Sequence, residues 1–134
     1  QEGWAEQVKA RMQQGPLCFS LAFRARGLAP RWVAAWANLR SDVFGLPYGD
    51  QGLLLQRSDY DRAGGYPDQP LMEDVALARS IRHKIRRLPA CAFTGADKYQ
   101  QQGWLRRGAK NLSLLLRYLL GAAPEDLARR YRGP

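Results

Sequence analysis

Residues 17–43, LCFSLAFRARGLAPRWVAAWANLRSDV, place a short apolar run directly before a segment with helical periodicity. The run from Leu17 to about Arg24 is rich in apolar and aromatic residues, which is typical of a buried strand. Gly27 and Pro30 interrupt it, and in the helix predicted from Arg31 to Val43 four apolar residues share one face: Trp32, Ala35, Trp36 and Leu39. A strand followed by a helix is the unit from which α/β proteins are built.

The same alternation extends to both sides of this unit. Upstream, GWAEQVKARM (residues 3–12) predicts a helix with apolar Trp4, Val8 and Met12 at helical spacing. Downstream, GLLLQR (residues 52–57) predicts a short buried strand, and Ser58 is positioned to cap a helix of one or two turns that stops at Gly64-Gly65.

The C-terminal half continues with a helix, a strand and two helices. The helix runs from Glu73 to about Lys84, and its predicted inward face is Leu77, Ala78, Ile81 and Ile85. RRLPACAFTG (residues 86–95) predicts a strand in which Pro89 indicates a sheet edge or a bulge. Helices follow over 104–120 and 124–131, joined at Gly121. We therefore expect an α/β fold with few short strands flanked by helices.

Composition narrows the class of protein. The 134 residues suit one domain, and 46% hydrophobic residues suffice for a core. A net charge of +9 favours anionic partners, whether nucleotides, nucleic acid or an acidic membrane surface. Cys18 and Cys91 lie in apolar stretches, which predicts two reduced, buried thiols and fits a cytoplasmic location. Neither a signal peptide nor a membrane-spanning segment is evident in the sequence.

Glu73 and Asp74 are the first candidates for chemistry, because they open a helix immediately after the loop GYPDQPLM (residues 65–72). In α/β sheets ligands gather where strands end and helices begin. A helix N-terminus favours an ionised carboxylate, so Asp74 could accept a proton from a bound hydroxyl. Acidic residues are also common in first turns without any catalytic role, and the pair alone does not separate the two interpretations.

Two further segments carry candidate binding residues. In LPYGDQGLLLQR (residues 46–57), Gly49 and Gly52 flank Asp50 and Gln51 directly before a strand, where glycines let the backbone approach a ligand; a turn closed by Asp50 itself is the alternative. In TGADKYQQQGW (residues 94–104), we expect a loop on which Lys98 and Tyr99 could hold a phosphate and cover a base or sugar, or simply face solvent.

Taken in order, the segments LPYGDQG, GGYPDQPLMEDVALARSIR and YLLGAAPEDLARRYRG resemble the C-terminal half of family 2 inverting glycosyltransferases. The similarity covers nearly the whole chain from Gly3. It is densest from Leu46 to Gly133, and it is greatest to the small bacterial branch associated with radical-SAM and selenium-domain proteins. The resemblance implies a GT-A fold with a mixed sheet between helices, and transfer of one sugar from a nucleotide-diphosphate sugar to an acceptor hydroxyl, lipid-linked or not, with inversion.

The resemblance also assigns roles to the candidate residues. Asp74 would be the general base and Glu73 would support it, while the turn 49–51 (Gly49, Asp50 and Gln51) would lie near the transferred sugar. Lys98 and Tyr99 would replace the Arg-Trp pair of the family's Gln-x-x-Arg-Trp motif, near the donor diphosphate. Gly95 stands where processive members carry Gln, which favours transfer of a single sugar, and Lys98 lacks the planar fork of an arginine.

The family's nucleotide-binding strands and its Asp-x-Asp metal motif have no match in these 134 residues. We therefore expect residues 1–134 to be the acceptor-side, C-terminal portion of a transferase domain whose N-terminal half is absent. An intact enzyme would use a divalent metal, Mg or Mn, while the chain alone would carry no metal ligands and be inactive.

Two segments of the sequence allow other functions. RSIRHKIRR (residues 79–87) could bind nucleic acid, but it lacks interleaved aromatic residues, and a helix with Ile81 and Ile85 inward would leave its arginines and His83 in solvent. The helix 104–120 could lie on the inner face of a membrane as part of a non-catalytic basic module, or pack five leucines on the sheet: Leu112, Leu115, Leu116, Leu119 and Leu120. A homo-oligomer is a further expectation, since an uncovered sheet edge recruits another chain.

Overall fold

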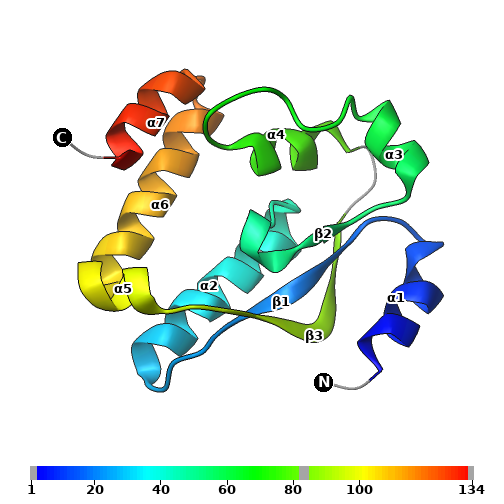
Figure 1. The fold of residues 1–134 in the computed structure, drawn as a ribbon, viewed down its shortest axis with the longest axis horizontal. Helices are drawn as coiled ribbons and strands as arrows, with labels where there is room; N and C mark the ends of the chain where they lie inside the picture. Colours follow the sequence, from blue (N-terminus) through cyan, green and yellow to red (C-terminus); the bar gives the residue numbers. More distant parts are fainter. Residues whose placement is uncertain (1–2, 82–84, 133–134) are drawn as a thin grey trace.

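The computed structural model describes residues 3–81 and 85–132. Its elements, drawn in Figure 1, are α1 (Trp4–Met12), β1 (Leu17–Phe23), α2 (Leu28–Phe44), the 3-10 turn η1 (Gly49–Gln51), β2 (Leu53–Leu54), α3 (Arg57–Arg62), α4 (Glu73–Ser80), β3 (Arg86–Thr94), α5 (Asp97–Gln102), α6 (Trp104–Leu119) and α7 (Pro124–Arg132). The alternation of strands and helices confirms the predicted α/β class.

The described strands form one small mixed sheet in the order β2-β1-β3. β1 is central: it pairs with β2 in antiparallel and with β3 in parallel orientation. Residues pointing to both faces of β1 are buried, because helices cover the sheet on each side. The prediction of few short strands flanked by helices is confirmed.

Pro89 lies in an irregular part of β3, as the sequence predicted. Between the pairs Cys18–Arg87 and Ser20–Cys91 the register of β1 and β3 shifts, so that Pro89 falls within a bulge. A proline has no N–H to donate to the ladder, and it is therefore tolerated where the regular pairing is interrupted.

The described core comprises three clusters of buried residues, and the smallest of them packs Val8 and Met12 of α1 against Leu17, Leu88 and Ala90 of the sheet. On one face α2 packs its buried residues Val33, Ala34 and Ala37 against β1. A second and larger cluster joins β1 to the C-terminal helices through Cys18, Leu46, Met72, Val75, Ala78, Ile85, Leu114, Leu115 and Leu127. This second cluster fixes α4, α6 and α7 relative to one another, and so it positions the residues of the site described below.

The helix expected from Glu73 to Lys84 is shorter than predicted, since α4 ends at Ser80 and Ile81 already has extended backbone angles. His83 lies outside the described residues. Arg86 and Arg87 belong to β3, where Arg86 donates to Gln14 and Arg87 pairs with Asp42 at 2.7 Å. The prediction of one solvated basic helical face over 79–87 is therefore wrong.

Three local predictions also need correction. Ser58 lies inside α3 rather than at its N-cap, which is Gln56. Residues 97–102, expected as a loop, form α5. Neither Cys18 nor Cys91 forms a disulfide in the described part of the chain, as predicted, but only Cys18 is buried; its burial raises the pKa of its thiol to about 11, while Cys91 is partly exposed.

The apolar residues that the sequence predicted on one face of α2, and those predicted on one face of α6, do share a helical face. Neighbouring elements leave this face of α2 exposed and cover this face of α6 only in part. In α2 the residues Trp32, Ala35, Trp36 and Leu39 are exposed. In α6 the buried leucines are Leu114 and Leu115, whereas Leu116, Leu119 and Leu120 are exposed, so the predicted packing of five leucines on the sheet holds only in part. Within residues 3–81 and 85–132 no helix is long and apolar enough to cross a membrane.

Two glycines give a matched test of the backbone. Gly45 ends α2 with a left-handed φ of 62°, and Gly108 lies inside α6; a Cβ at either position would meet nothing within 4 Å. Gly45→Ala is expected to lower the free energy of unfolding by about 1 kcal/mol, because alanine disfavours a positive φ. Gly108→Ala is expected to raise it by about 0.5–1 kcal/mol through helix propensity. Urea unfolding measures both, and equal effects of the same sign would contradict the assignment of the α2 terminus.

Candidate functional site

Two adjoining pockets lie between α4, η1, α5 and the C-terminal helices. One has a volume of about 190 Å³ and contains Glu73 and Asp74 in its wall, and the other has a volume of about 420 Å³ and contains Asp50, Lys98 and Tyr99. Tyr48, Asn111 and Tyr131 line both pockets, so the two are compartments of one cleft. Residues as far apart in sequence as Tyr48 and Tyr131 therefore meet at a single place.

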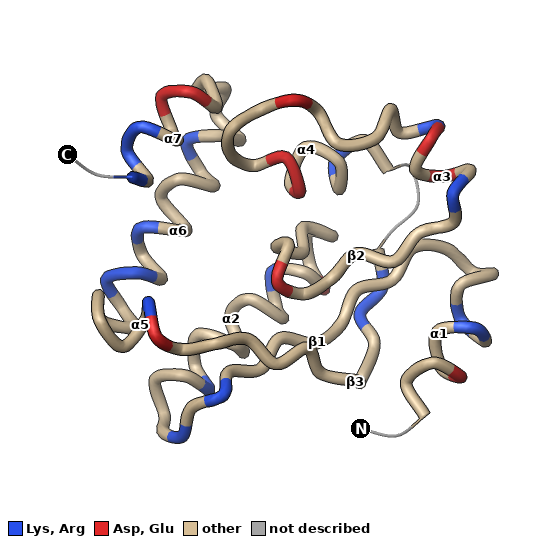
Figure 2. Tube along the Cα trace, in the orientation of Figure 1, with Lys and Arg blue, Asp and Glu red and all other residues tan. Residues whose placement is uncertain are grey.

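Asp74 joins two of the segments singled out from the sequence. Its Oδ2 accepts the backbone N–H of Gly49 at 2.7 Å, and its Oδ1 accepts the N–H of Val75 at 2.7 Å. Figure 2 shows the acidic segments at the start of α4 and in η1 facing each other. Each carboxylate oxygen keeps a second lone pair, so Asp74 can still accept a proton or hydrogen bond from a ligand.

The backbone before Asp74 has an unusual conformation that aims the carboxylate. Met72, the N-cap of α4, has a left-handed φ of 65°, and among the described residues it is the non-glycine residue with a positive φ. Its side chain is buried in the core cluster with Val75 and Leu114, which holds this conformation in place. Strained backbone of this kind is found at functional sites more often than elsewhere.

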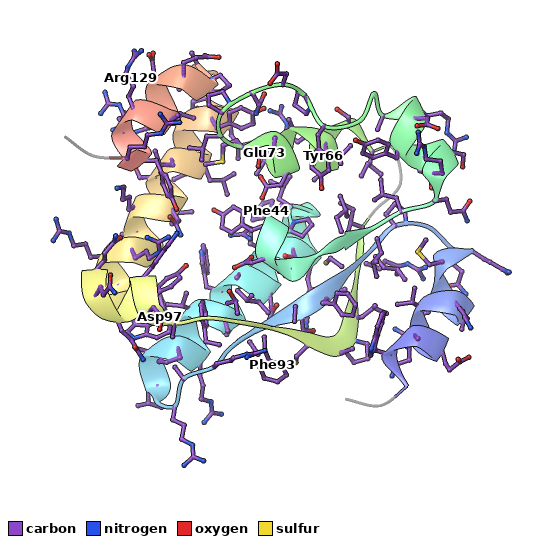
Figure 3. All side chains as sticks on the ribbon, viewed as in Figure 1. Phe44, Tyr66, Glu73, Phe93, Asp97 and Arg129 are labelled. Atoms are coloured by element: carbon purple, nitrogen blue, oxygen red, sulfur yellow. The ribbon has the colours of Figure 1, made fainter. Side chains whose placement is uncertain are left out.

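Glu73 lies beside Asp74 in the wall of the smaller pocket, but its side chain is exposed. Figure 3 labels Glu73 on α4 and Asp97 near the start of α5, which border different parts of the cleft. The structure thus separates the two carboxylates of the pair: Asp74 is anchored to η1, and Glu73 faces solvent at the pocket rim.

Burial raises the pKa of the Asp74 carboxyl above its ordinary value, and the N–H groups of Gly49 and Val75 offset part of this increase. Glu73 adds to the increase through like-charge repulsion. A carboxylate with a raised pKa is a stronger base than an ordinary aspartate, which suits it to remove a proton.

Asp74→Asn is expected to become more stable relative to the native protein as the pH rises. The folded carboxyl holds its proton where the unfolded one has lost it, so its contribution to stability is full below the ordinary pKa of 3.8 and is lost as the pH rises through the raised, folded-state value. Asparagine does not titrate. The difference in free energy of unfolding, variant minus native, should therefore be larger at about pH 7 than at about pH 3.5 in urea titrations. A difference that is constant or falls with pH would contradict this origin of the shift.

Gln51 holds the turn in place instead of facing the cleft. Its side chain is 0% exposed. Its Oε1 accepts from Ser41 Oγ at 2.9 Å and from the N–H of Tyr48 at 3.2 Å, and its Nε2 donates to the carbonyl of Phe19 at 3.3 Å. Gly49 and Asp50 reach the site, Gly49 through its N–H and Asp50 in the wall of the larger pocket.

Arg40 is a buried cation beneath this turn. Its guanidinium lies 3.4 Å from the ring centroid of Tyr48, and its Nε donates to the carbonyl of Leu46 at 2.9 Å. Desolvation lowers the pKa of Arg40 from its ordinary value. Desolvation of the Asp50 carboxyl by the surrounding protein raises its pKa, and the positive charge of Arg40 offsets part of this increase. Asp50 as a whole residue is nevertheless exposed to solvent.

Lys98 and Tyr99 lie on α5 and both line the larger pocket. Lys98 is exposed. Tyr99 stacks on Trp104 with ring centroids 5.0 Å apart, packs edge-on against Phe23, and accepts a hydrogen bond from Asn111 at 3.2 Å. Burial raises the pKa of the Tyr99 hydroxyl. Tyr99 is therefore a fixed part of the pocket wall, while Lys98 is a cation free to turn toward a ligand.

Several residues of the cleft did not stand out in the sequence. Arg107 lies 5.2 Å from the Tyr99 ring centroid and donates to the hydroxyl of Tyr131 at 3.1 Å. In the described part of the chain the Nε of Arg107 is buried without a hydrogen-bond partner. Asn111, a polar residue in a leucine-rich helix, was the available signal for this wall, and Tyr48 and Tyr131 stand within the segments LPYGDQG and YLLGAAPEDLARRYRG.

We tested whether the cleft could hold a divalent metal by itself. Among the residues that the structure describes, no group of three or more His, Cys, Asp or Glu side chains lies close enough together to bind a metal ion. These residues do not fit a complete metal site, and we assign no chemical step to one.

A scan against protein-family models and searches of curated proteins and of solved structures gave no match to this chain.

Proposed function

We propose that this chain carries the acceptor-activating part of an inverting glycosyltransferase of GT-A type, with Asp74 as the general base. The contact that supports this most strongly is the 2.7 Å hydrogen bond from the N–H of Gly49 to Asp74, which joins LPYGDQG to the MED sequence in one cleft. These are two of the segments on which the resemblance to family 2 glycosyltransferases rests. Lys98 and Tyr99, which the resemblance would place near the donor diphosphate, line the adjoining pocket.

In the proposed reaction an acceptor hydroxyl lies in the smaller pocket within hydrogen-bond reach of Asp74. The oxygen of the acceptor hydroxyl attacks the anomeric carbon of the donor sugar as the bond from that carbon to the diphosphate oxygen breaks. The bonding electron pair leaves with the nucleoside diphosphate, and the hydroxyl proton passes to the Asp74 carboxylate. One displacement at the anomeric carbon inverts its configuration.

The larger pocket has the chemistry to receive the leaving diphosphate. Lys98 and Arg107 supply positive charge there, which suits an anion. Asp50 in the same wall suits the hydroxyl groups of a sugar, since carboxylates accept hydrogen bonds from them. In this proposal the acceptor binds in the smaller pocket beside Asp74, and the donor binds in the larger pocket beside Lys98.

Calorimetric titration with UDP- and GDP-sugars, in the presence of Mg²⁺ or Mn²⁺, tests this proposal on the chain and on the full product of its gene. We expect the full product to bind one class of nucleotide sugar, and Arg107→Gln to weaken that binding about tenfold or more, because a charge-assisted bond to phosphate is lost. Arg129→Gln, on the exposed face of α7, is the matched control. Absence of binding by the full product to every nucleotide sugar would refute the proposal.

A further inference from the structure

The exposed side of α2 is an apolar stripe. Leu28, Trp32, Ala35, Leu39 and Val43 recur at steps of three or four residues and are all exposed; Trp32 is 62% and Leu39 is 52% exposed. The opposite side of α2 carries the residues that pack on β1. Four large apolar side chains in solvent on one helix, Leu28, Trp32, Leu39 and Val43, form a patch of the kind that marks an interaction surface.

A second apolar stripe lies on α6 and continues the first. Leu105, Ala109 and Leu116 of α6, and Leu120 directly after its end, are exposed at helical spacing; Leu105 is 68% and Leu116 is 51% exposed. α2 and α6 pack against each other, and Trp36 of α2 and Leu112 of α6 line the same small cavity between them. Trp36 follows Ala35 of the first stripe and Leu112 lies one helical turn beyond Ala109 of the second, so each stripe borders this cavity. We call the two stripes together the α2–α6 face.

Positive charge borders the α2–α6 face. Arg31 flanks the stripe on α2, Arg24 and Arg26 precede that helix, and Arg106 and Arg117 flank the stripe on α6; all five are exposed. α6 contains no Asp or Glu, and Figure 2 accordingly draws no acidic segment on it. The acidic residue of α2 is Asp42, which is paired with Arg87.

We propose that the α2–α6 face binds the surface of an anionic lipid bilayer, with α2 and α6 lying in the plane of the interface. Trp and Leu side chains bordered by arginines have the chemistry of interfacial helices, which bury apolar residues at the headgroup boundary and hold acidic lipids by charge. A second copy of the chain would be a poorer occupant, since each copy carries a net charge of +9 and the same arginines would face one another. This inference does not depend on the proposed glycosyl transfer.

Vesicle sedimentation tests the proposal by comparing two lipid compositions. Anionic vesicles contain phosphatidylcholine with about one-third phosphatidylglycerol, and neutral vesicles contain phosphatidylcholine alone. We expect binding to the anionic vesicles and much weaker binding to the neutral ones. Trp32→Gln combined with Leu105→Gln should weaken binding to anionic vesicles about tenfold or more, because two exposed side chains no longer enter the interface. Arg31→Gln combined with Arg106→Gln should weaken it about fivefold for each arginine.

Matched controls lie on the other end of the sheet. Trp4→Gln removes a half-exposed tryptophan of α1, and Arg57→Gln removes an exposed arginine of α3; neither should change vesicle binding. Circular dichroism and thermal melting confirm that each variant is folded. Equal loss of binding in Trp4→Gln and Trp32→Gln/Leu105→Gln would overturn the proposal. Sedimentation without lipid tests the alternative occupant. If the native chain forms a dimer that Trp32→Gln/Leu105→Gln dissociates, and if no vesicle binding is observed, the α2–α6 face binds a second copy and the proposal is overturned as well.

Discussion

Replacement of Asp74 by Asn is expected to lower kcat for sugar transfer by a factor of about 10²–10⁴ in the full product of the gene. The amide cannot accept the proton of the acceptor hydroxyl, so the transition state loses its base while the substrates keep their other contacts. The Asn Oδ1 can still accept the N–H of Gly49, as the Asp74 carboxylate does at 2.7 Å, and the local fold should therefore persist. The affinity for donor, measured by calorimetry, should change little.

The appropriate control is Asp68→Asn, which removes an exposed carboxylate from the loop that precedes α4. This variant should retain full activity. Glu73→Gln tests the rest of the acidic pair, and because Glu73 is exposed at the pocket rim we expect a smaller loss than for Asp74→Asn. If Asp74→Asn keeps native kcat, or if Glu73→Gln is the more damaging change, Asp74 is not the base.

Gln51→Leu is expected to lower the free energy of unfolding by about 3 kcal/mol or more. Gln51 is fully buried, and its amide satisfies the Ser41 hydroxyl, the N–H of Tyr48 and the carbonyl of Phe19. Leucine has a similar volume but no polar atoms, so the N–H of Tyr48 and the carbonyl of Phe19 would lose this hydrogen bond, and the Ser41 hydroxyl would keep only its bond to the Ala37 carbonyl. Since the turn 49–51 also presents the Gly49 N–H to Asp74, activity should fall together with stability.

Urea unfolding followed by circular dichroism measures this effect. Gln101→Leu, at an exposed position of α5, is the matched control and should change the free energy of unfolding by less than about 0.5 kcal/mol. A small effect of Gln51→Leu, comparable with that of the control, would contradict the view that the buried amide holds the turn.

The strand and helix pattern was predictable from the sequence because long apolar periodicities dominate it. β1, α2, α6 and α7 lie where periodicity placed them, and Pro89 marked the bulge in β3. α5 was missed because DKYQQQ has no apolar period. Its position is set by tertiary packing of Tyr99 against Phe23 and Trp104, which no local pattern reveals.

The site was predictable in its acidic and loop residues, and less so in its walls. Asp74, Asp50, Lys98 and Tyr99 all line the cleft. Gln51 was a candidate because it stands between Gly49 and Gly52, where the backbone could approach a ligand, yet its side-chain amide bonds to Ser41 and to the carbonyl of Phe19 inside the protein. Periodicity likewise located the apolar face of α2 but could not indicate whether protein covers it, since that depends on which elements pack nearby.

The measurement that tests the central claim most directly is the configuration of the transferred sugar. The full-length gene product is supplied with a nucleotide sugar of known anomeric configuration and with an acceptor. Proton NMR of the glycoside that forms then gives the new configuration from its anomeric coupling. The account predicts inversion, with the product signal lost in Asp74→Asn. A product that retains the donor configuration, or one formed equally well by Asp74→Asn, would contradict a single displacement with Asp74 as its base.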